Sequence, residues 1–132
     1  MRFSPQKNIY VRKRILVIDD DKEMTGMIKQ YLEEYGQFEV QELNNSQESL
    51  NVAKQFNPDL ILLDLMMPSK TGDEVANDLK DDCDLKNVPI IFLTGVVLEK
   101  EAKNRHGQIG GHVFLSKPVK LEELMECIYK HV

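Results

Sequence analysis

Acidic residues follow two apolar runs of the sequence, at the point where each run ends. Asp19 and Asp20 follow residues 15–18, and Asp64 follows residues 60–63. If both runs are parallel strands of one sheet, their carboxyl ends share an edge, and the three carboxylates converge there. Such groups repel one another unless a cation neutralises them. Hard oxygen ligands at a small site favour Mg²⁺, which we therefore expect at this cluster.

Two other predicted strand ends carry groups that suit a bound anion. Thr94 ends the apolar residues 90–93 with a hydroxyl, and Lys117 follows residues 113–115 with an ammonium group. Taken singly, each reads as a turn hydroxyl or a solvated surface lysine. Taken with the acids, on four strand ends, they indicate a site for a metal and an anion. Asp21 is expected instead to cap the next helix through Met24.

The elements that position these residues alternate along the chain. Residues 15–18, 60–63, 90–93 and 113–115 are apolar at nearly every position, which is typical of parallel strands buried on both faces. Residues 38–41 alternate between apolar and polar side chains, which favours a strand at a sheet edge.

Helical spacing of apolar residues fills the intervals between the strands. The first helix carries Met24, Met27, Ile28, Tyr31, Leu32 and Tyr35 and ends at Gly36. We expect a second helix from Ser46 to before Pro58, with Leu50, Ala53 and Phe56 facing inward, and a third around Val75, Ala76 and Leu79. A fourth, mostly polar helix is expected near Glu99 to His106. The fifth runs from Lys120 to about His131 and buries Leu121, Leu124 and Ile128.

Five strand–helix units predict a three-layer α/β domain with a doubly wound, five-stranded parallel sheet. With the alternating strand at an edge, the flavodoxin-like strand order 2-1-3-4-5 follows. We assign residues 14–132 to this domain and residues 1–13 to an N-terminal extension. Gly107, Gly110 and Gly111 make the approach to the last strand glycine-rich, and we expect a loop there.

Composition excludes several classes of function. The chain has 132 residues, 30% of them charged, and a net charge of −5, which disfavours binding to nucleic acid or anionic membranes. The basic residues at its start are too sparse for a binding arm: Arg2, Lys7, Arg12, Lys13 and Arg14. Cys83 and Cys127 have no close partner in sequence, so neither a zinc site nor a disulfide framework is indicated. We expect a cytoplasmic protein without a membrane span.

Four segments in this order resemble the motifs of response-regulator receiver domains, the CheY-like family of two-component systems. They are Ile-Leu-Val-Ile-Asp-Asp-Asp-Lys-Glu at residues 15–23, Asp-Leu-Met-Met-Pro at 64–68 followed by Gly72, Phe-Leu-Thr-Gly at 92–95, and Phe-Leu-Ser-Lys-Pro at 114–118. Each motif is weak alone, but the set is specific. The resemblance runs from about Arg14 to the C-terminus.

The resemblance implies a phosphorylation switch with Asp64 as the phosphoacceptor. The phosphoryl group would come from a histidine of a sensor kinase or of a histidine phosphotransfer protein. Asp20, Asp64 and the backbone carbonyl of Met66 would bind Mg²⁺ directly, and Asp19 would bind it mainly through water. The domain would catalyse only its own phosphorylation and dephosphorylation, and would not be an enzyme in the ordinary sense.

Switching, by the same resemblance, would involve the hydroxyl of Thr94 and the aromatic ring of Phe114. Gly95 would leave room for the phosphoryl group, Lys117 would bind it, and the Lys117–Pro118 bond would be cis. The face of the fourth helix, fifth strand and fifth helix would contact an unknown downstream protein, and a homodimer through it is compatible with the sequence.

Some positions depart from the commonest family pattern. Phe114 replaces a frequent tyrosine, so no hydroxyl is present there. Met66 and Val96 occupy positions at which relatives tune dephosphorylation, and both are apolar. Because neither can orient an attacking water, we expect slow hydrolysis of the phosphorylated form.

Three alternatives stay open at this point. A Mg²⁺-dependent phosphatase of the haloacid-dehalogenase type would carry its nucleophile on the first strand in an Asp-x-Asp pattern, which is absent here. A flavin- or nucleotide-binding module would need a phosphate-binding loop after the first strand, where residues 19–23 are instead mainly acidic. A receiver that works by phosphorylation-independent contacts has the same fold, and sequence does not separate it.

Overall fold

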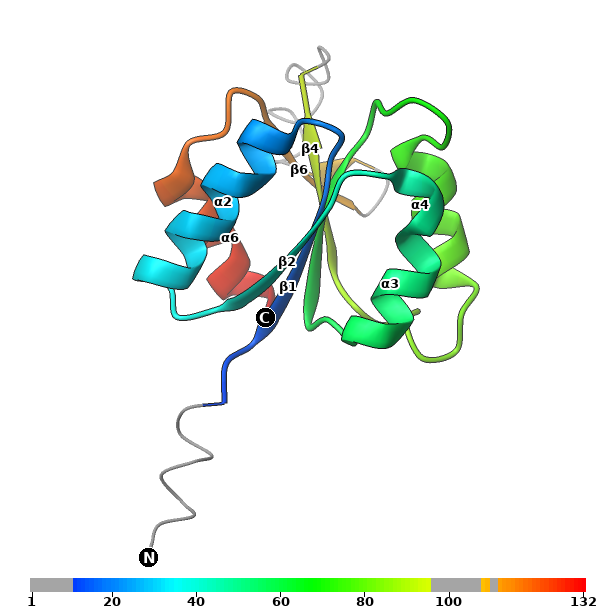
Figure 1. Cartoon of the computed structure of the whole chain (residues 1–132), viewed down its shortest axis with the longest axis horizontal. Coiled ribbons are helices and arrows are strands. Elements are labelled where there is room, and N and C mark those ends of the chain that lie inside the picture. Colours follow the sequence, from blue (N-terminus) through cyan, green and yellow to red (C-terminus); the bar gives the residue numbers. More distant parts are fainter. Residues whose placement is uncertain (1–10, 96–107, 110–111) are drawn as a thin grey trace, which may run out of the picture.

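The computed structural model describes residues 11–95, 108–109 and 112–132, which form a sheet covered by helices on both faces. Figure 1 shows α2 (Lys22–Tyr35) and α6 (Leu121–His131) side by side on one face. On the other face lie α3 (Ser49–Phe56) and α4 (Gly72–Lys80). This is the predicted three-layer α/β architecture.

The sheet has the order β2-β1-β3-β4-β6-β5. All neighbouring strands are parallel except β5 and β6. The predicted order 2-1-3-4-5 is therefore confirmed for the five parallel strands, with the alternating strand at one edge. The strands are β1 (Arg14–Ile18), β2 (Glu39–Leu43), β3 (Leu60–Asp64), β4 (Ile90–Thr94), β5 (Gln108–Ile109) and β6 (His112–Ser116).

A short antiparallel strand, β5, extends the sheet beyond the five predicted parallel strands. Its residue Ile109 pairs with His112, and Gln108 pairs with Val113. The sequence prediction did not include this strand, because it is only two residues long.

Helix boundaries follow from local hydrogen bonding. The Asp21 side chain accepts a hydrogen bond from the Met24 N–H at 3.1 Å, which confirms the predicted cap of α2. The Gly36 N–H donates to the Leu32 carbonyl and ends that helix, also as predicted. The segment from Ser46 begins as a 3-10 turn, Ser46–Glu48, before α3. The polar helix expected at 99–106 lies outside the described residues, as do Val96, Gly107, Gly110 and Gly111.

Two apolar clusters fill the space between the layers. Ile15 and Val17 face α2 and α6, whereas Leu16 and Ile18 face α3 and α4, so β1 is buried on both sides as expected. Helix α6 buries Leu124 and Ile128, while Leu121 is only partly buried. Leu50 and Phe56 are also half-buried, beside the fully buried Ala53.

Two apolar residues of α2 do not follow the expected burial. Ile28 and Leu32 are buried, but Met27 is 48% exposed and Tyr35 is 66% exposed. The helix presents a narrow stripe to the sheet, and these two side chains lie beyond its edges. Among the described residues, no helix has the length and apolar character needed to cross a membrane.

Candidate functional site

Acidic side chains meet where β1 and β3 end. Ile18 and Leu63 are register partners, so the residues that follow them, Asp19 and Asp64, lie beside each other. Asp19 is 1% exposed and Asp64 is 3% exposed, whereas Asp20 is open to solvent. One carboxylate oxygen of each residue lies within 4.8 Å of the others. The sequence prediction that the three acids share one edge of the sheet is therefore confirmed.

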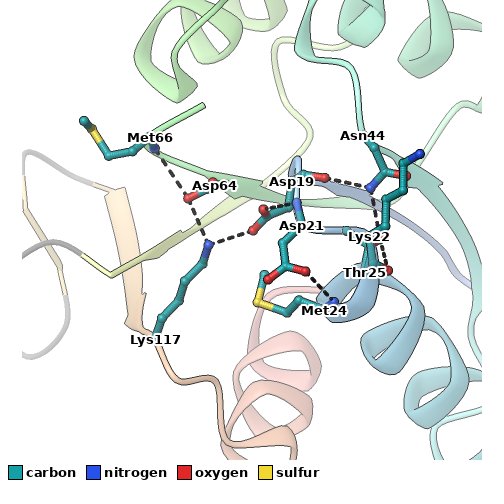
Figure 2. Close-up of polar contacts among 9 residues, drawn as sticks. All are labelled: Asp19, Asp21, Lys22, Met24, Thr25, Asn44, Asp64, Met66 and Lys117. Atoms are coloured by element: carbon teal, nitrogen blue, oxygen red, sulfur yellow. Dashed lines mark hydrogen bonds and ion pairs between the residues drawn. The ribbon is translucent and has the colours of Figure 1, made fainter. Parts of the chain in front are cut away.

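Lys117, the residue after β6, brings a cation into this cluster. Its Nζ lies 2.9 Å from Asp19 Oδ2 and 3.3 Å from Asp64 Oδ1 (Figure 2). Its backbone N–H donates to the Thr94 carbonyl at 2.8 Å, which fixes the start of the side chain beside β4. The Lys117–Pro118 peptide bond is cis. One ammonium group thus contacts acids that come from two different strands.

The electrostatics of the site reflect burial and crowding of like charges. Burial raises the pKa of Asp19, and the neighbouring Asp64 raises it further, while hydrogen bonds from Lys117 and from the Asp21 backbone oppose that shift. Burial acts to lower the pKa of Lys117, but the hydrogen bond and charge of Asp19 outweigh it, so its pKa is raised. The ammonium form is therefore favoured at this position.

The donor set fits a hard divalent cation. Asp19 Oδ2 is buried, and its charged neighbour is the Lys117 ammonium group at 2.9 Å, which is shared with Asp64. One positive charge therefore faces three carboxylates, and buried carboxylates are costly unless charge compensates them. Three clustered carboxylates, one of them open to solvent, suit Mg²⁺, which keeps several of its waters. Asp19, Asp20 and Asp64 are the side chains that would hold it.

The loop after Asp64 folds back over the end of β3. The Met66 N–H points at Asp64 Oδ1 across 3.4 Å, and the Leu65 N–H donates to the Leu93 carbonyl at 3.1 Å. The Gly72 N–H donates to the Leu65 carbonyl at 2.9 Å. A Cβ on Gly72 would stand 2.4 Å from the Asp64 carbonyl oxygen, so this close approach requires glycine. The Met66 side chain is 62% exposed.

The remaining predicted residues lie on β4, directly after it, or on β6. Thr94 ends β4 and is 3% exposed. Among the described residues, a Cβ on the exposed Gly95 would come within 4 Å of the Lys117 side chain alone, at 3.9 Å. Phe114 is half-buried on β6 and stacks on Phe92, with ring centroids 5.1 Å apart. Thr94 and Gly95 therefore lie at the carboxyl end of β4, whereas Phe114 lies two residues before the end of β6, and the roles of all three stay predictions.

Sequence reasoning missed a set of polar residues behind the acids. Asn44 follows β2, and its amide nitrogen donates to the Asp19 carbonyl and to Thr25 Oγ1 (Figure 2). Ser46 lies buried beneath the loop after Asp64, where its hydroxyl donates to the Pro68 carbonyl and accepts from the Lys70 N–H. Asn44 directly follows β2, but the strand expected at residues 38–41 ended before Glu42, so its position after a strand was not evident from the sequence.

Comparison with known proteins shows similarity to response regulators over most of the chain. The family model for the response regulator receiver domain matches residues 15–129. The polar-differentiation response regulator DivK of Brucella anthropi is 29% identical over 120 residues, which cover 91% of this chain and 96% of DivK. A probable transcriptional regulator, ycf29 of Pyropia yezoensis, is 36% identical over 115 residues, 87% of this chain, but the match spans only 51% of that protein.

Solved structures of response regulators and receiver domains have the same fold. The chemotaxis protein CheY4 of Vibrio cholerae superposes with a TM-score of 0.78 at 26% identity, covering 92% of this chain and all of CheY4. The signal receiver domain of a histidine kinase from Syntrophus aciditrophicus gives a TM-score of 0.74 at 27% identity, covering 89% and 88% of the two chains. The similarity extends over nearly the whole fold.

Proposed function

This chain belongs to the response regulator receiver domain family, and we propose that it works as a phosphorylation switch with Asp64 as the phosphoacceptor. The observation that supports this most directly is the position of Asp64. Its carboxylate lies at the carboxyl edge of the sheet, beside two other acids and within 3.3 Å of the Lys117 ammonium group. Residues 14–132 form the receiver domain in this proposal, preceded by a short extension.

The reaction transfers a phosphoryl group from a phosphohistidine of a partner protein. A carboxylate oxygen of Asp64 attacks the phosphorus, the P–N bond breaks, and the imidazole nitrogen leaves with the bonding electron pair and takes up a proton. The product is an acyl phosphate on Asp64. An anionic nucleophile and an anionic phosphoryl group repel each other, and Lys117 lies where its charge offsets that repulsion.

The acid cluster gives the site its metal requirement. We propose that Asp20 and Asp64 bind Mg²⁺ directly, that Asp19 binds it through water, and that the Met66 carbonyl completes the protein ligands. The ion supplies positive charge that stabilises the transferring phosphoryl oxygens. Lys117 also orients Asp19, since its Nζ lies 2.9 Å from Oδ2.

Phosphorylation changes contacts with other proteins in this proposal. Thr94 ends β4 and Gly95 follows it, and in this proposal the hydroxyl of Thr94 responds to the phosphoryl group. Phe114 lies one strand away and stacks on Phe92 of β4, which gives the ring a route to sense movement there. A downstream protein would then recognise the surface that includes β6 and α6. Neither nucleic acid nor membrane is a partner in this proposal.

Intact-mass measurement after incubation with acetyl phosphate and Mg²⁺ tests the acceptor. The wild-type protein should gain one phosphoryl group, and the Asp64→Asn variant should gain none. Asp73→Asn is a matched control, because Asp73 is an exposed acid in the first turn of α4 and should leave the adduct unchanged.

The same experiment separates the alternatives. An undiminished adduct on Asp64→Asn would mean that the acceptor is another residue. No adduct on the wild-type protein would favour a phosphorylation-independent interaction domain. Steady turnover of a generic phosphate ester would favour a phosphatase.

A further inference from the structure

We infer that Asn44 is a positioning residue that holds the Asp19–Asp20 peptide group in the orientation that metal binding needs. The amide nitrogen of Asn44 donates to the Asp19 carbonyl at 2.8 Å and to Thr25 Oγ1 at 3.1 Å. This inference rests on the proposed metal site. Asn44 would act on that site through the Asp19 backbone carbonyl and not through a carboxylate.

The backbone of Asp19 is held on both sides by the end of β2. Its N–H donates to the Leu43 carbonyl at 3.0 Å, which continues the ladder between β1 and β2 by one step. Its carbonyl accepts from the side chain of the next residue, Asn44. Leu43 and Asn44 together therefore fix the backbone N–H and the backbone carbonyl of Asp19 at the point where the strand becomes a loop.

The orientation of the Asn44 amide is determined by its partner. A backbone carbonyl can only accept, so the nitrogen of the amide must face Asp19. Thr25 then receives the second N–H of the same nitrogen. Figure 2 shows Asn44 between these two partners, on the side of Asp19 away from Lys117.

A buried anchor supports the amide from behind. Thr25 is fully buried on the first turns of α2, and its hydroxyl lies 2.8 Å from Glu42 Oε1, to which it donates. The order of hydrogen bonds is thus Glu42, Thr25, Asn44 and the Asp19 carbonyl. Glu42 and Asn44 lie in β2 and directly after it, Thr25 lies on α2, and Asp19 follows β1, so this series of hydrogen bonds joins three segments.

The Asp19 carbonyl belongs to the peptide group that leads directly into Asp20. Rotation of that group would move the Asp20 Cα and swing its carboxylate, which is exposed and has little packing of its own. Asp19 is buried and is held by Lys117 as well, so Asp20 is the acid that depends most on this peptide. Groups that orient metal ligands commonly change metal affinity about 10- to 100-fold when removed.

Mg²⁺ affinity measured by isothermal titration calorimetry tests the inference. Asn44→Ala should weaken binding about tenfold, at the lower end of that range, because one hydrogen bond is lost. Asn45→Ala is the matched control, since the Asn45 side chain accepts from the Gln47 N–H at the start of the 3-10 turn and does not reach Asp19. That control should leave Mg²⁺ affinity unchanged.

A second readout separates positioning from a general loss of stability. At saturating Mg²⁺, phosphorylation of Asn44→Ala by acetyl phosphate should approach the wild-type rate, because the ion restores the arrangement of the acids. Thr25→Val should also weaken Mg²⁺ binding, whereas Thr25→Ser, which keeps the hydroxyl, should not. If Asn44→Ala does not fold, the comparison of Thr25→Val with Thr25→Ser tests the positioning role instead.

The outcomes are distinct. A folded Asn44→Ala protein with wild-type Mg²⁺ affinity overturns the inference and leaves the phosphoacceptor proposal intact. Equal affinities of Thr25→Val and Thr25→Ser would do the same. Wild-type protein that binds no Mg²⁺ would remove the metal site, and this inference with it.

Discussion

The ammonium group of Lys117 lies closer to Asp19, at 2.9 Å, than to Asp64, at 3.3 Å. Lys117 therefore acts first as the counter-ion of a buried acid that is not the proposed acceptor. Without a metal, one ammonium group neutralises part of a cluster of three carboxylates. A Mg²⁺ ion in the cluster would compensate the same charges, so the lysine and the metal should partly replace each other in stabilising the fold.

Replacing Lys117 with methionine should destabilise the metal-free protein. Loss of one partner leaves Asp19 buried without its counter-ion, which costs about 3 kcal/mol of unfolding free energy. Added Mg²⁺ should recover much of that loss, because its charge compensates the same cluster of carboxylates. Urea unfolding with and without Mg²⁺ measures both values. Lys120→Met is the control, since that side chain is 77% exposed; equal losses for Lys117→Met in both conditions would contradict the prediction.

Substitution of Gly72 by alanine should distort the acceptor loop. The new Cβ would stand 2.4 Å from the Asp64 carbonyl oxygen and 2.8 Å from the Leu65 Cα, and both neighbours are backbone atoms that cannot turn away. We expect a loss of about 3 kcal/mol in unfolding free energy, with weaker phosphorylation of Asp64.

Gly26→Ala is the opposite case and serves as control for Gly72→Ala. Gly26 lies inside α2, and among the described residues its new Cβ would come near Glu42 Oε1 alone, at 3.8 Å. Alanine should stabilise the helix by about 0.5–1 kcal/mol. Denaturant unfolding of the two variants should therefore shift in opposite directions, and a neutral Gly72→Ala would refute the close approach.

The contribution of Glu33 to the stability of the protein, through its contact with the edge strand β2, should depend on pH. Glu33 accepts from Lys29 Nζ at 3.0 Å and from the Val40 N–H at 3.1 Å, which ties α2 to the strand. Burial acts to raise the pKa of Glu33, but these two hydrogen bonds outweigh it and hold the pKa below its usual value of 4.5. The stabilisation is therefore present above pH 4.5 and is lost as the pH falls through the lowered pKa.

The Glu33→Gln variant tests whether the stabilisation by Glu33 is lost as the pH falls. At pH 7 the variant should lose about 1 kcal/mol of unfolding free energy, and below the lowered pKa the difference should disappear. Urea unfolding at a series of pH values measures this. Glu34→Gln, at the exposed neighbouring position, should show little change at any pH. A deficit that persists in acid would indicate that packing, rather than charge, makes the contribution.

Local pattern was sufficient to predict most of the fold and the position of the acids. Apolar runs that end in Asp19 and Asp64 give the strands, their burial and their shared edge, because parallel strands end on the same side. The sequence did not predict how individual side chains are packed or paired, because these depend on the tertiary structure. The exposure of Met27 depends on how α2 is rotated against the sheet, and the ion pair of Lys117 with Asp19 depends on the path of the chain around Pro118.

Polar side chains were the least predictable part of the site. Asn44 is one of two adjacent asparagines, and sequence does not show which one faces the acids and which one caps the next turn. Ser46 looks like an ordinary helix start, yet its hydroxyl contacts the backbone of Pro68 and Lys70, more than twenty residues away. Such contacts depend on loop conformation, which neither hydrophobic periodicity nor residue propensity specifies.

Hydrolysis of the phosphorylated protein should be slow because the residue two positions after the acceptor is apolar. The Met66 backbone N–H points at Asp64 Oδ1, while its side chain is 62% exposed, so it borders the site without offering a polar group. Water that attacks the acyl phosphate would therefore not be oriented by this side chain. Met66→Gln places an amide at the same position, and should accelerate loss of the phosphoryl group severalfold.

Decay of the phosphorylated form, followed by intact mass after removal of acetyl phosphate, measures this effect. Met27→Gln is the control, because Met27 is also a largely exposed methionine but lies on α2. Its decay should match that of the wild-type protein. Rapid decay of the wild-type adduct would show that water is oriented by another group, and an unchanged rate in Met66→Gln would show that orientation from this position does not limit hydrolysis.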